Sequence, residues 1–373
     1  MAKGKRFIKY FLTVLIVILS LNFTDSENKT QSSFLKSGYT NGVVVSANEI
    51  ASEVGVDIMK RGGNAVDAIV GTAFALAVVY PQAGNIGGGG FMVARLSDGR
   101  EVSVDFRETA PSSADRDMYL DSNGNVIPDL STDGHLASGV PGSVEGLLHI
   151  LDKYGTMKRA DVMSYAINLA ENGFRINSEL ASALNSYGSE FGNYAGSKEI
   201  FGKKFSEGDL LAQEDLANTL RQISEKGRDG FYSGETADRI VAEMKRGGGI
   251  ISYEDLANYR CVDRIPIKGK YKGYDVITMG PPSSGGMCLI YLLNILDSYD
   301  LKFLGYGSSR YVNLLAEAMK VVYADRSEYM GDPDFYKVPL KVLISKEYAA
   351  ERMRNFEFGK VRREITPGNI RSE

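Results

Sequence analysis

Residues 65–80 restrict the fold more than any other segment of this chain. Their sequence, AVDAIVGTAFALAVVY, places apolar side chains on nearly every face of a helix, and such a helix must be buried on most of its sides. Asn64 is a good N-cap for this helix, and Asp67 stands where it can return a hydrogen bond to the backbone. The segment is too short for a convincing membrane span, and Asp67 and Gly71 interrupt it. The sequence therefore predicts a capped helix in the interior of a folded protein.

Composition and charge are those of a packed, acidic protein. The chain has 373 residues, of which 43% are apolar and 24% are charged, which is enough for two modest domains or one large one. The net charge is −4. Because binding to the phosphates of a nucleic acid needs a basic face, this excess of acidic residues argues against a nucleic-acid partner. The two cysteines, Cys261 and Cys288, could form a disulfide in an oxidising compartment or remain free thiols. No Cys/His cluster with zinc spacing is present in the sequence.

The N-terminus has the pattern of a secretory signal. Residues 1–10 are basic, the run from Phe11 to Phe23 is apolar, and a polar stretch follows. Because a membrane-spanning helix needs about 20 apolar residues, this run favours a signal peptide over residues 1–24. No A-x-A cleavage site is visible, so an uncleaved anchor stays open as the alternative. We predict export to the periplasm or the extracellular space, with residues 25–41 as a polar linker.

Strand-like and helical patterns follow one another irregularly along the rest of the chain. Residues 42–47 and 272–280 favour strands, and residues 91–107 favour a β-hairpin that turns at 97–99. Helical patterns, several of them ended by glycine, cover residues 49–63, 143–155, 160–173, 216–227, 284–299 and 308–331. A doubly wound sheet would show regular strand–helix repeats. The prediction is instead a helix-rich α/β (α+β) protein.

A run of glycines joins the buried helix to the predicted hairpin. Residues 81–91 read PQAGNIGGGGF. Their spacing does not fit the G-x-G-x-x-G dinucleotide fingerprint, and no Lys-Ser/Thr pair follows, which excludes a phosphate loop. Glycine permits positive φ and close backbone approach, so the run predicts either a tight packing turn or a turn beside a reaction centre. We favour the first interpretation, on which a side chain in this run would displace the hairpin.

The serine and histidine residues do not form a complete active site. Ser283 and Ser284, in PPSSGG, can cap the helix that follows, but the G-x-S-x-G nucleophile elbow is not present. His135 lies in a loop pattern, and His149 lies in an apolar helical pattern typical of a packed residue. A serine–histidine enzyme therefore has little support.

Arg107 closes the predicted hairpin in the stretch VDFRETAP and is followed at once by Glu108. A guanidinium presents a rigid fork of donors that suits two-point contact with a carboxylate. At a strand end, this fork could hold the carboxylate of a substrate. The competing interpretation is a structural ion pair with an Asp or Glu, and the residue pattern alone favours that pair.

Seven segments occur together and in order, and as a set they resemble the large subunit of a γ-glutamyltranspeptidase. They are GGNAVDA at 62–68, PQAGNIGGGGF at 81–91, DFRETAP at 105–111, GVPGSVEG at 139–146, GGIISYEDLANY at 248–259, PPSSGG at 281–286 and YADRSEYMGDPDF at 323–335. None is specific alone, but the ordered set is. The resemblance extends from about residue 42 to the end of the chain.

The resemblance implies an N-terminal-nucleophile hydrolase with an αββα sandwich, to which residues 42–360 contribute the helix-rich large-subunit domain. Members of this family are made as one precursor, which cuts itself before a threonine that becomes the N-terminal nucleophile. The implied reaction takes the γ-glutamyl group from glutathione or a related amide and passes it to water, an amino acid or a peptide. No metal or organic cofactor is implied.

The resemblance assigns one residue of this chain to the substrate. Arg107 matches the family arginine that grips the α-carboxylate of the γ-glutamyl group, which reverses the preference for a structural pair. No catalytic residue is assigned here, because the nucleophilic threonine is expected on a small subunit. Residues 361–373 are expected to be a flexible tail near the self-cleavage site. Thr366 is followed by Pro and Gly, and it does not match the Thr-Thr-His-like start of the small subunit.

Two alternative interpretations of the sequence remain. A cephalosporin-acylase-like or poly-γ-glutamate-cleaving relative would share the scaffold and the nucleophile but take a different acyl group. A truncated, non-catalytic remnant would lack the nucleophile altogether. A Thr-Thr-His-like continuation of the reading frame past Glu373 would support the enzyme, and a stop codon there would support the remnant.

Overall fold

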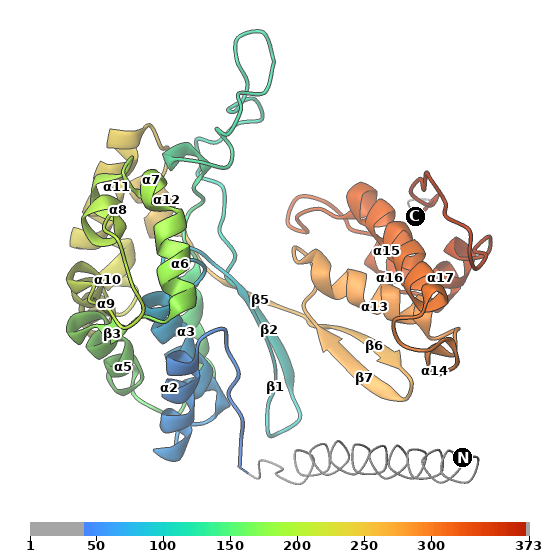
Figure 1. Ribbon diagram of the computed structural model, residues 1–373, viewed down its shortest axis with the longest axis horizontal. Helices are drawn as coiled ribbons and strands as arrows, with labels where there is room; N and C mark the ends of the chain where they lie inside the picture. Colours follow the sequence, from blue (N-terminus) through green and yellow to red (C-terminus); the bar gives the residue numbers. More distant parts are fainter. Residues whose placement is uncertain (1–40, 371–373) are drawn as a thin grey trace, which may run out of the picture.

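The computed structural model describes residues 41–370, which form two packed units (Figure 1). The N-terminal unit, residues 41–264, has a hydrophobic core that includes Ala51 and Tyr259. The C-terminal unit, residues 265–370, has a separate core that begins at Ile267. Both units contain more helices than strands, which confirms the prediction of a helix-rich α+β protein.

The N-terminal unit packs helices around a small antiparallel sheet. Its helices are α2 (Glu49–Lys60), α3 (Ala65–Val79), α4 (Ser143–Tyr154), α5 (Arg159–Asn172), α6 (Ser178–Ser186), α7 (Gly188–Phe191), α8 (Ala195–Phe201), α9 (Glu214–Lys226), α10 (Asp229–Tyr232), α11 (Gly234–Gly247) and α12 (Tyr253–Asn258), with a 3₁₀ turn at His135–Ala137. The sheet has the strand order β1 (Phe91–Arg95), β2 (Glu101–Asp105), β5 (Val262–Arg264). A short separate pair joins β3 (Phe174–Arg175) to β4 (Leu210–Leu211).

Helix α3 is the interior helix that residues 65–80 predict. Its apolar side chains are buried almost all round, and Phe74 is fully buried. Asn64 and Asp67 form the predicted capping box, in which Asp67 accepts a hydrogen bond from the Asn64 N–H at 2.8 Å. Asp67 is itself buried; burial opposes its ionisation, but hydrogen bonds from Thr156 and from neighbouring backbone N–H groups lower its pKa. The cap therefore also ties the start of α3 to the loop that follows α4.

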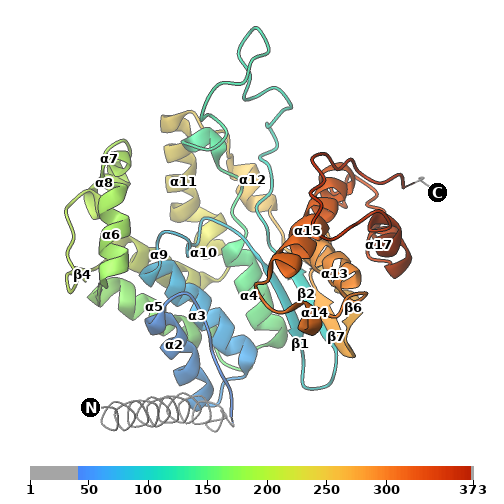
Figure 2. The ribbon, with the colours of Figure 1, turned by 45° about the vertical axis from the view of Figure 1, so that its right-hand side comes forward.

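The β1–β2–β5 sheet is covered on one face and only partly open on the other, the open face, where Ser103 and Asp105 of β2 are buried. Met92 and Val104 point into the core and are 7% and 0% exposed, whereas Val93 and Val262 on the opposite face are 39% and 38% exposed. Because side chains alternate across a strand, the register places the two pairs on opposite faces. Helix α4 lies against β2 on the covered face (Figure 2). Within residues 41–370, no second sheet covers the open face.

The C-terminal unit packs helices over a hairpin. The hairpin pairs β6 (Ile267–Tyr271) with β7 (Tyr274–Thr278). The helices are α13 (Ser284–Leu296), α14 (Leu301–Leu304), α15 (Ser309–Tyr329), α16 (Leu340–Leu343) and α17 (Lys346–Arg352). Helix α13 lies against β6, α15 and α17, so α15 is fixed from one side by the core of this unit.

Several local predictions are wrong or are now decided. The stretch 42–47 is not a strand, because no strand within the described residues pairs with it. Ser283 occupies the N-cap of α13, yet neither its hydroxyl nor another side chain caps that helix. Cys261 and Cys288 are free thiols, and they pack against different cores.

The two ends of the chain are described to different extents. The predicted signal peptide and residues 25–40 of the predicted linker lie outside the described residues, as do residues 371–373. Residues 361–370, part of the predicted flexible tail, form no helix or strand but are hydrogen-bonded to α15 and α17. Within the described part of the chain, no helix has the length and apolar character needed to cross a membrane.

Candidate functional site

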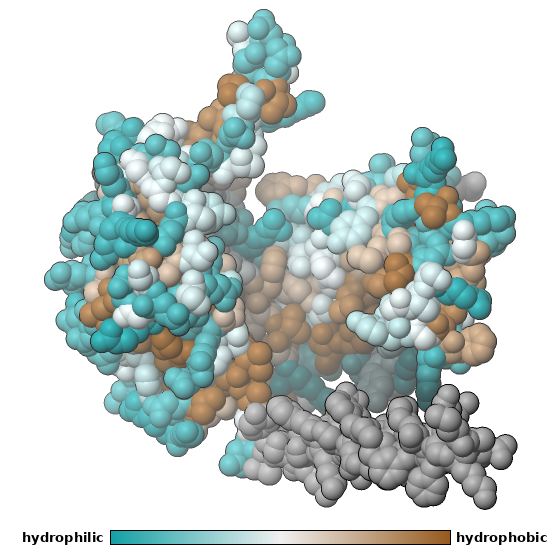
Figure 3. All heavy atoms as spheres, viewed as in Figure 1, coloured by the Kyte–Doolittle hydropathy of each residue, from teal (hydrophilic) through white to brown (hydrophobic). Residues whose placement is uncertain are grey.

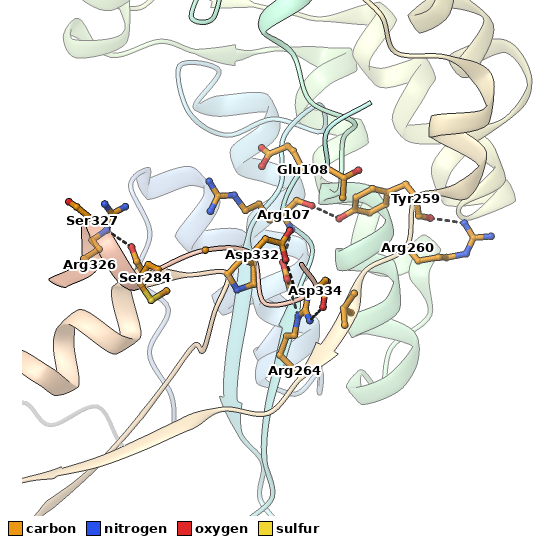
Figure 4. Close-up of a pocket in the computed structure, with 16 residues that line it drawn as sticks. Arg107, Glu108, Tyr259, Arg260, Arg264, Ser284, Arg326, Ser327, Asp332 and Asp334 are labelled. Atoms are coloured by element: carbon orange, nitrogen blue, oxygen red, sulfur yellow. Dashed lines mark hydrogen bonds and ion pairs between the residues drawn. The ribbon is translucent and has the colours of Figure 1, made fainter. Parts of the chain in front are cut away.

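A pocket of about 420 Å³ lies where the two units meet (Figure 4). The N-terminal unit contributes the end of β2 with the residues after it, and β5 with the segment that leads into it. The C-terminal unit contributes the start of α13, the end of α15 and the loop after it. Most of the lining side chains are charged or polar: Asp105, Arg107, Glu108, Thr109, Tyr259, Arg260, Arg264, Ser284, Arg326, Ser327, Asp332 and Asp334.

Glycines pack against the backbone next to Arg107 and fix its position. A Cβ added to Gly89 would lie 2.5 Å from the Phe106 carbonyl oxygen and 2.9 Å from the Arg107 Cα, and a Cβ on Gly142 would collide with the same carbonyl oxygen. None of glycines 87–90 has a positive φ. The role of Gly89 is therefore close approach of two backbones, not an unusual conformation. The glycine run packs directly against the strand end that carries Arg107.

Hydrogen bonds hold the main chain of Arg107 on both sides. The Arg107 N–H donates to Asp105 Oδ1 at 3.1 Å, and the Tyr259 hydroxyl donates to the Arg107 carbonyl oxygen at 2.8 Å. Burial raises the pKa of Tyr259, so its hydroxyl keeps the proton that it donates. The Arg107 side chain is exposed, and in the view of Figure 4 it extends away from Tyr259. A fixed backbone thus carries a side chain that is free to bind.

The neighbouring carboxylate, Asp105, is paired with Arg264 and not with Arg107. Arg264 Nε lies 3.2 Å from Asp105, and the same guanidinium makes two bonds of 2.7 Å to Asp334. These bonds raise the pKa of Arg264 and lower that of Asp334. Arg107 forms no ion pair with any described residue, Glu108 included. The structural pair that the residue pattern alone favours is therefore not formed within residues 41–370.

Arg326 is a lining residue to which the sequence assigned no role. It lies near the end of α15, and its Nε donates to Ser284 Oγ at 2.8 Å. Like Arg107, it has no carboxylate partner among the described residues. The one signal in the sequence was its place in the segment YADRSEYMGDPDF. Arg107 and Arg326 together make the pocket suited to an anionic ligand.

Neither histidine lies in the pocket. His135 Nε2 is 2.8 Å from Glu243 Oε1, and His149 Nε2 is 3.3 Å from Asp263 Oδ1. Both rings are thus engaged by carboxylates away from the serines of PPSSGG, and no serine–histidine pair forms in the described part of the chain. Burial raises the pKa of the Cys261 thiol to about 12, which makes it a poor nucleophile.

Three comparisons with known proteins agree with one another. The family model for gamma-glutamyltranspeptidase matches residues 51–368. The glutathione hydrolase proenzyme of Escherichia coli (strain K12) is 49% identical over 335 residues, which is 88% of this chain and 58% of that protein. The crystal structure of Helicobacter pylori gamma-glutamyltranspeptidase matches with a TM-score of 0.87 and 48% identity, covering 89% of this chain and 97% of that chain. The Acylase ACY 1 proenzyme of Pseudomonas sp. (strain SE83) is 39% identical over 320 residues, 83% of this chain and 57% of that protein.

The fold and these likenesses first define a class: the chain has the helix-rich large-subunit part of an N-terminal-nucleophile hydrolase fold. Within that class, the chain belongs to the γ-glutamyltranspeptidase family. It spans 58% of the length of the Escherichia coli relative. Identity is higher to the glutathione hydrolase than to the acylase.

Proposed function

We propose that this chain is the large-subunit part of a γ-glutamyltransferase and glutathione hydrolase. The observation that carries the proposal is the state of Arg107. Its backbone is fixed by Gly89 and Tyr259, while its guanidinium is exposed in the pocket with no carboxylate partner among the described residues. Such a fork suits the α-carboxylate of a γ-glutamyl group in two-point contact.

The proposed reaction places its nucleophile outside this chain. An N-terminal threonine, produced by self-cleavage past Glu373, attacks the γ-carbonyl carbon of the substrate, and its own α-amino group or a water accepts the hydroxyl proton. The amine leaves with a proton, and a γ-glutamyl ester of the threonine forms. Water or an amine acceptor then attacks the ester and frees the threonine. Arg107 anchors the far end of the acyl group, which fixes where the carbonyl carbon lies.

The proposed partner is a small subunit that covers the open face of the β1–β2–β5 sheet. Val93 and Val262 project from this face, and Ile265, just after β5, is 88% exposed. Figure 3 shows apolar side chains gathered in the hollow between the two units. A second sheet stacked here would complete an αββα sandwich and bury these side chains.

The location and processing follow from the same proposal. Residues 1–24 act as a signal peptide, and the protein is exported to the periplasm or beyond. The precursor is a zymogen until it cuts itself. The word proenzyme in the names of the Escherichia coli and Pseudomonas relatives supports this order of events.

The test is the intact mass and N-terminal sequence of the full gene product after expression and export. We expect two pieces, the second of which begins with threonine, and release of amine from a γ-glutamyl anilide. Replacement of that threonine by alanine should leave one uncut, inactive chain. A wild-type product that stays in one piece and releases no amine would overturn the proposal in favour of a non-catalytic remnant.

A cephalosporin-acylase-like or poly-γ-glutamate-cleaving activity is the second candidate, and the 39% identity to the acylase supports it. A glutaryl group keeps the distal carboxylate of a γ-glutamyl group but lacks its α-ammonium. The pocket contains Glu108 and Asp332, whose carboxylates form no ion pair among the described residues. These carboxylates favour a substrate with an α-ammonium. Glu108→Gln should therefore weaken hydrolysis of a γ-glutamyl amide and leave that of a glutaryl amide unchanged.

A further inference from the structure

Residues 362–370, the last described part of the chain, have no regular secondary structure (Figure 2). Two buried carboxylates nevertheless hold them in place. Glu317 and Asp325 lie on α15 and are 1% and 0% exposed. They are eight positions apart, a spacing that puts both on one face of a helix. Each carboxylate accepts a hydrogen bond from the terminal segment, so the two together form a brace.

The first point of the brace is Glu317. Its carboxylate accepts from Arg362 Nε at 2.7 Å and from the Arg362 N–H at 3.3 Å, and Lys320 Nζ lies 2.7 Å away. Lys320 also donates to the Arg362 carbonyl oxygen at 3.0 Å. Burial disfavours the charged form, but Lys320 and Arg362 bring the pKa of Glu317 below its ordinary value. Both the side chain and the main chain of Arg362 are therefore fixed to α15.

The second point of the brace is Asp325. Its Oδ1 accepts from the Gly368 N–H at 2.7 Å, and its Oδ2 accepts from Tyr291, Tyr348 and Arg352 at 2.7, 3.1 and 3.0 Å. A buried carboxylate is costly unless its oxygens are satisfied. Here one oxygen is satisfied by the backbone of the terminal segment.

Further contacts close the brace around Gly368. Arg352 donates to the Thr366 carbonyl oxygen at 2.7 Å, and the Tyr329 hydroxyl donates to the Gly368 carbonyl oxygen and accepts from the Ile370 N–H. A Cβ on Gly368 would collide with the Tyr348 hydroxyl. The segment therefore fits only with a bare backbone at this position.

We infer that the brace formed by Glu317 and Asp325 fixes the course of residues 362–370, and that this placement positions the self-cleavage site for its reaction. The inference rests on the proposed function, in which the precursor cuts itself shortly after this segment. The brace does not touch the reacting atoms. Its residues act by position: they hold the chain against α15 up to residue 370, so the part of the precursor that leads to the scissile bond starts from a fixed point.

The test measures the rate of self-cleavage of the full-length precursor. Arg362→Gln removes the side-chain contact to Glu317, and Gly368→Ala forces the segment away from α17. We expect each variant to cleave about 10- to 100-fold more slowly than wild type, the cost of misplacing a reacting group by about an ångström. Hydrogen exchange of the peptide covering residues 362–370 should speed up in both variants. Arg362→Lys, which keeps the charge, should restore part of the rate.

Matched controls separate the brace from general stability. Arg363→Gln makes the same change at the next residue, which is exposed and makes no ion pair within the described residues. Gly188→Ala adds a methyl group where nothing lies within 4 Å. Val322→Ala destabilises the same helix from its core and removes no hydrogen bond to the segment. All three should cleave at the wild-type rate at temperatures where the protein is folded.

The outcomes are distinct. Wild-type cleavage rates in Arg362→Gln and Gly368→Ala, with hydrogen exchange of residues 362–370 accelerated, would overturn the inference and leave the proposed function intact. A wild-type precursor that never cleaves would overturn the proposed function and the inference together. If Arg362→Gln fails to fold, Gly368→Ala alone decides. Slow cleavage in Val322→Ala to the same extent as in Gly368→Ala would show that stability, not placement, is responsible.

Discussion

The two walls of the pocket are held in place by different forces. On the N-terminal wall, the backbone of Phe106 and Arg107 lies so close to Gly89 that a Cβ there would not fit, and the Asp105–Arg264 ion pair adds to this packing. On the C-terminal wall, α15 buries Glu317 and Asp325, and charged hydrogen bonds satisfy both. The first wall depends on the absence of side-chain volume, and the second depends on the presence of paired charge. Added volume should therefore damage the first wall, and loss of charge should damage the second.

The largest effect is expected from breaking the charged wall. Asp325→Ala leaves Arg352, whose side chain is only 16% exposed, without its carboxylate, and it leaves the Tyr291 hydroxyl without an acceptor. Removing one partner of a buried pair costs about 3–5 kcal/mol. Urea unfolding should show this loss in the free energy of unfolding. Glu328→Ala, an exposed acid on the same helix, should change it by no more than about 0.5 kcal/mol.

The next effect is expected from adding volume to the glycine wall. Gly89→Val places side-chain atoms where the backbone of residues 106–108 already lies, and such overpacking costs about 3 kcal/mol. The midpoint of thermal unfolding should fall, and the yield of folded protein should fall with it. Gly87→Val is the control, because the space at Gly87 is open. Equal stability of the two variants would contradict the packing role of Gly89.

A third effect should appear in binding and not in stability. Arg107→Ala removes a charge-assisted contact worth about 1.5–3 kcal/mol, so the KM of the complete, processed enzyme for a γ-glutamyl amide should rise about 10- to 100-fold. Arg107→Lys should also be impaired, because a point charge replaces the fork. The exposed Arg354 offers the control Arg354→Ala, with an unchanged KM. An unchanged KM in Arg107→Ala would reject the binding role.

The smallest effect on stability is expected from lowering the pH. The pKa of Glu317 in the folded protein lies below its ordinary value of 4.5. Its contribution to stability is therefore complete above about pH 4.5 and is lost as the pH falls through the folded pKa. Thermal unfolding between pH 6 and pH 3 should show a decline that is shallower in Glu317→Gln than in wild type. Parallel declines in the two proteins would show that Glu317 does not contribute.

Much of the fold follows from local patterns in the sequence. The apolar periodicity of residues 65–80, with Asn64 and Asp67 before and within it, predicts α3 and its capping box, and both are present. The turn at 97–99 predicts the β1–β2 hairpin, which is also present. These features depend on neighbours within a few residues, so the sequence contains the necessary information. The prediction of a strand at 42–47 was wrong because a strand needs a hydrogen-bonding partner strand, and the local sequence does not show whether one is present.

The sequence by itself determined the helix-rich character of the chain, the central buried helix, the hairpin that leads to Arg107 and the likeness to one family; the second strand ends at Asp105, two residues before the predicted end. Only the tertiary structure decided that Arg107 has no carboxylate partner among residues 41–370, because Asp105 pairs with Arg264, which lies 159 residues further along the chain. Only the tertiary structure showed that residues 362–370 are fixed to α15, through contacts with Glu317 that span 45 residues. Local propensity cannot encode such pairings. They arise when distant segments meet and buried charges must find partners.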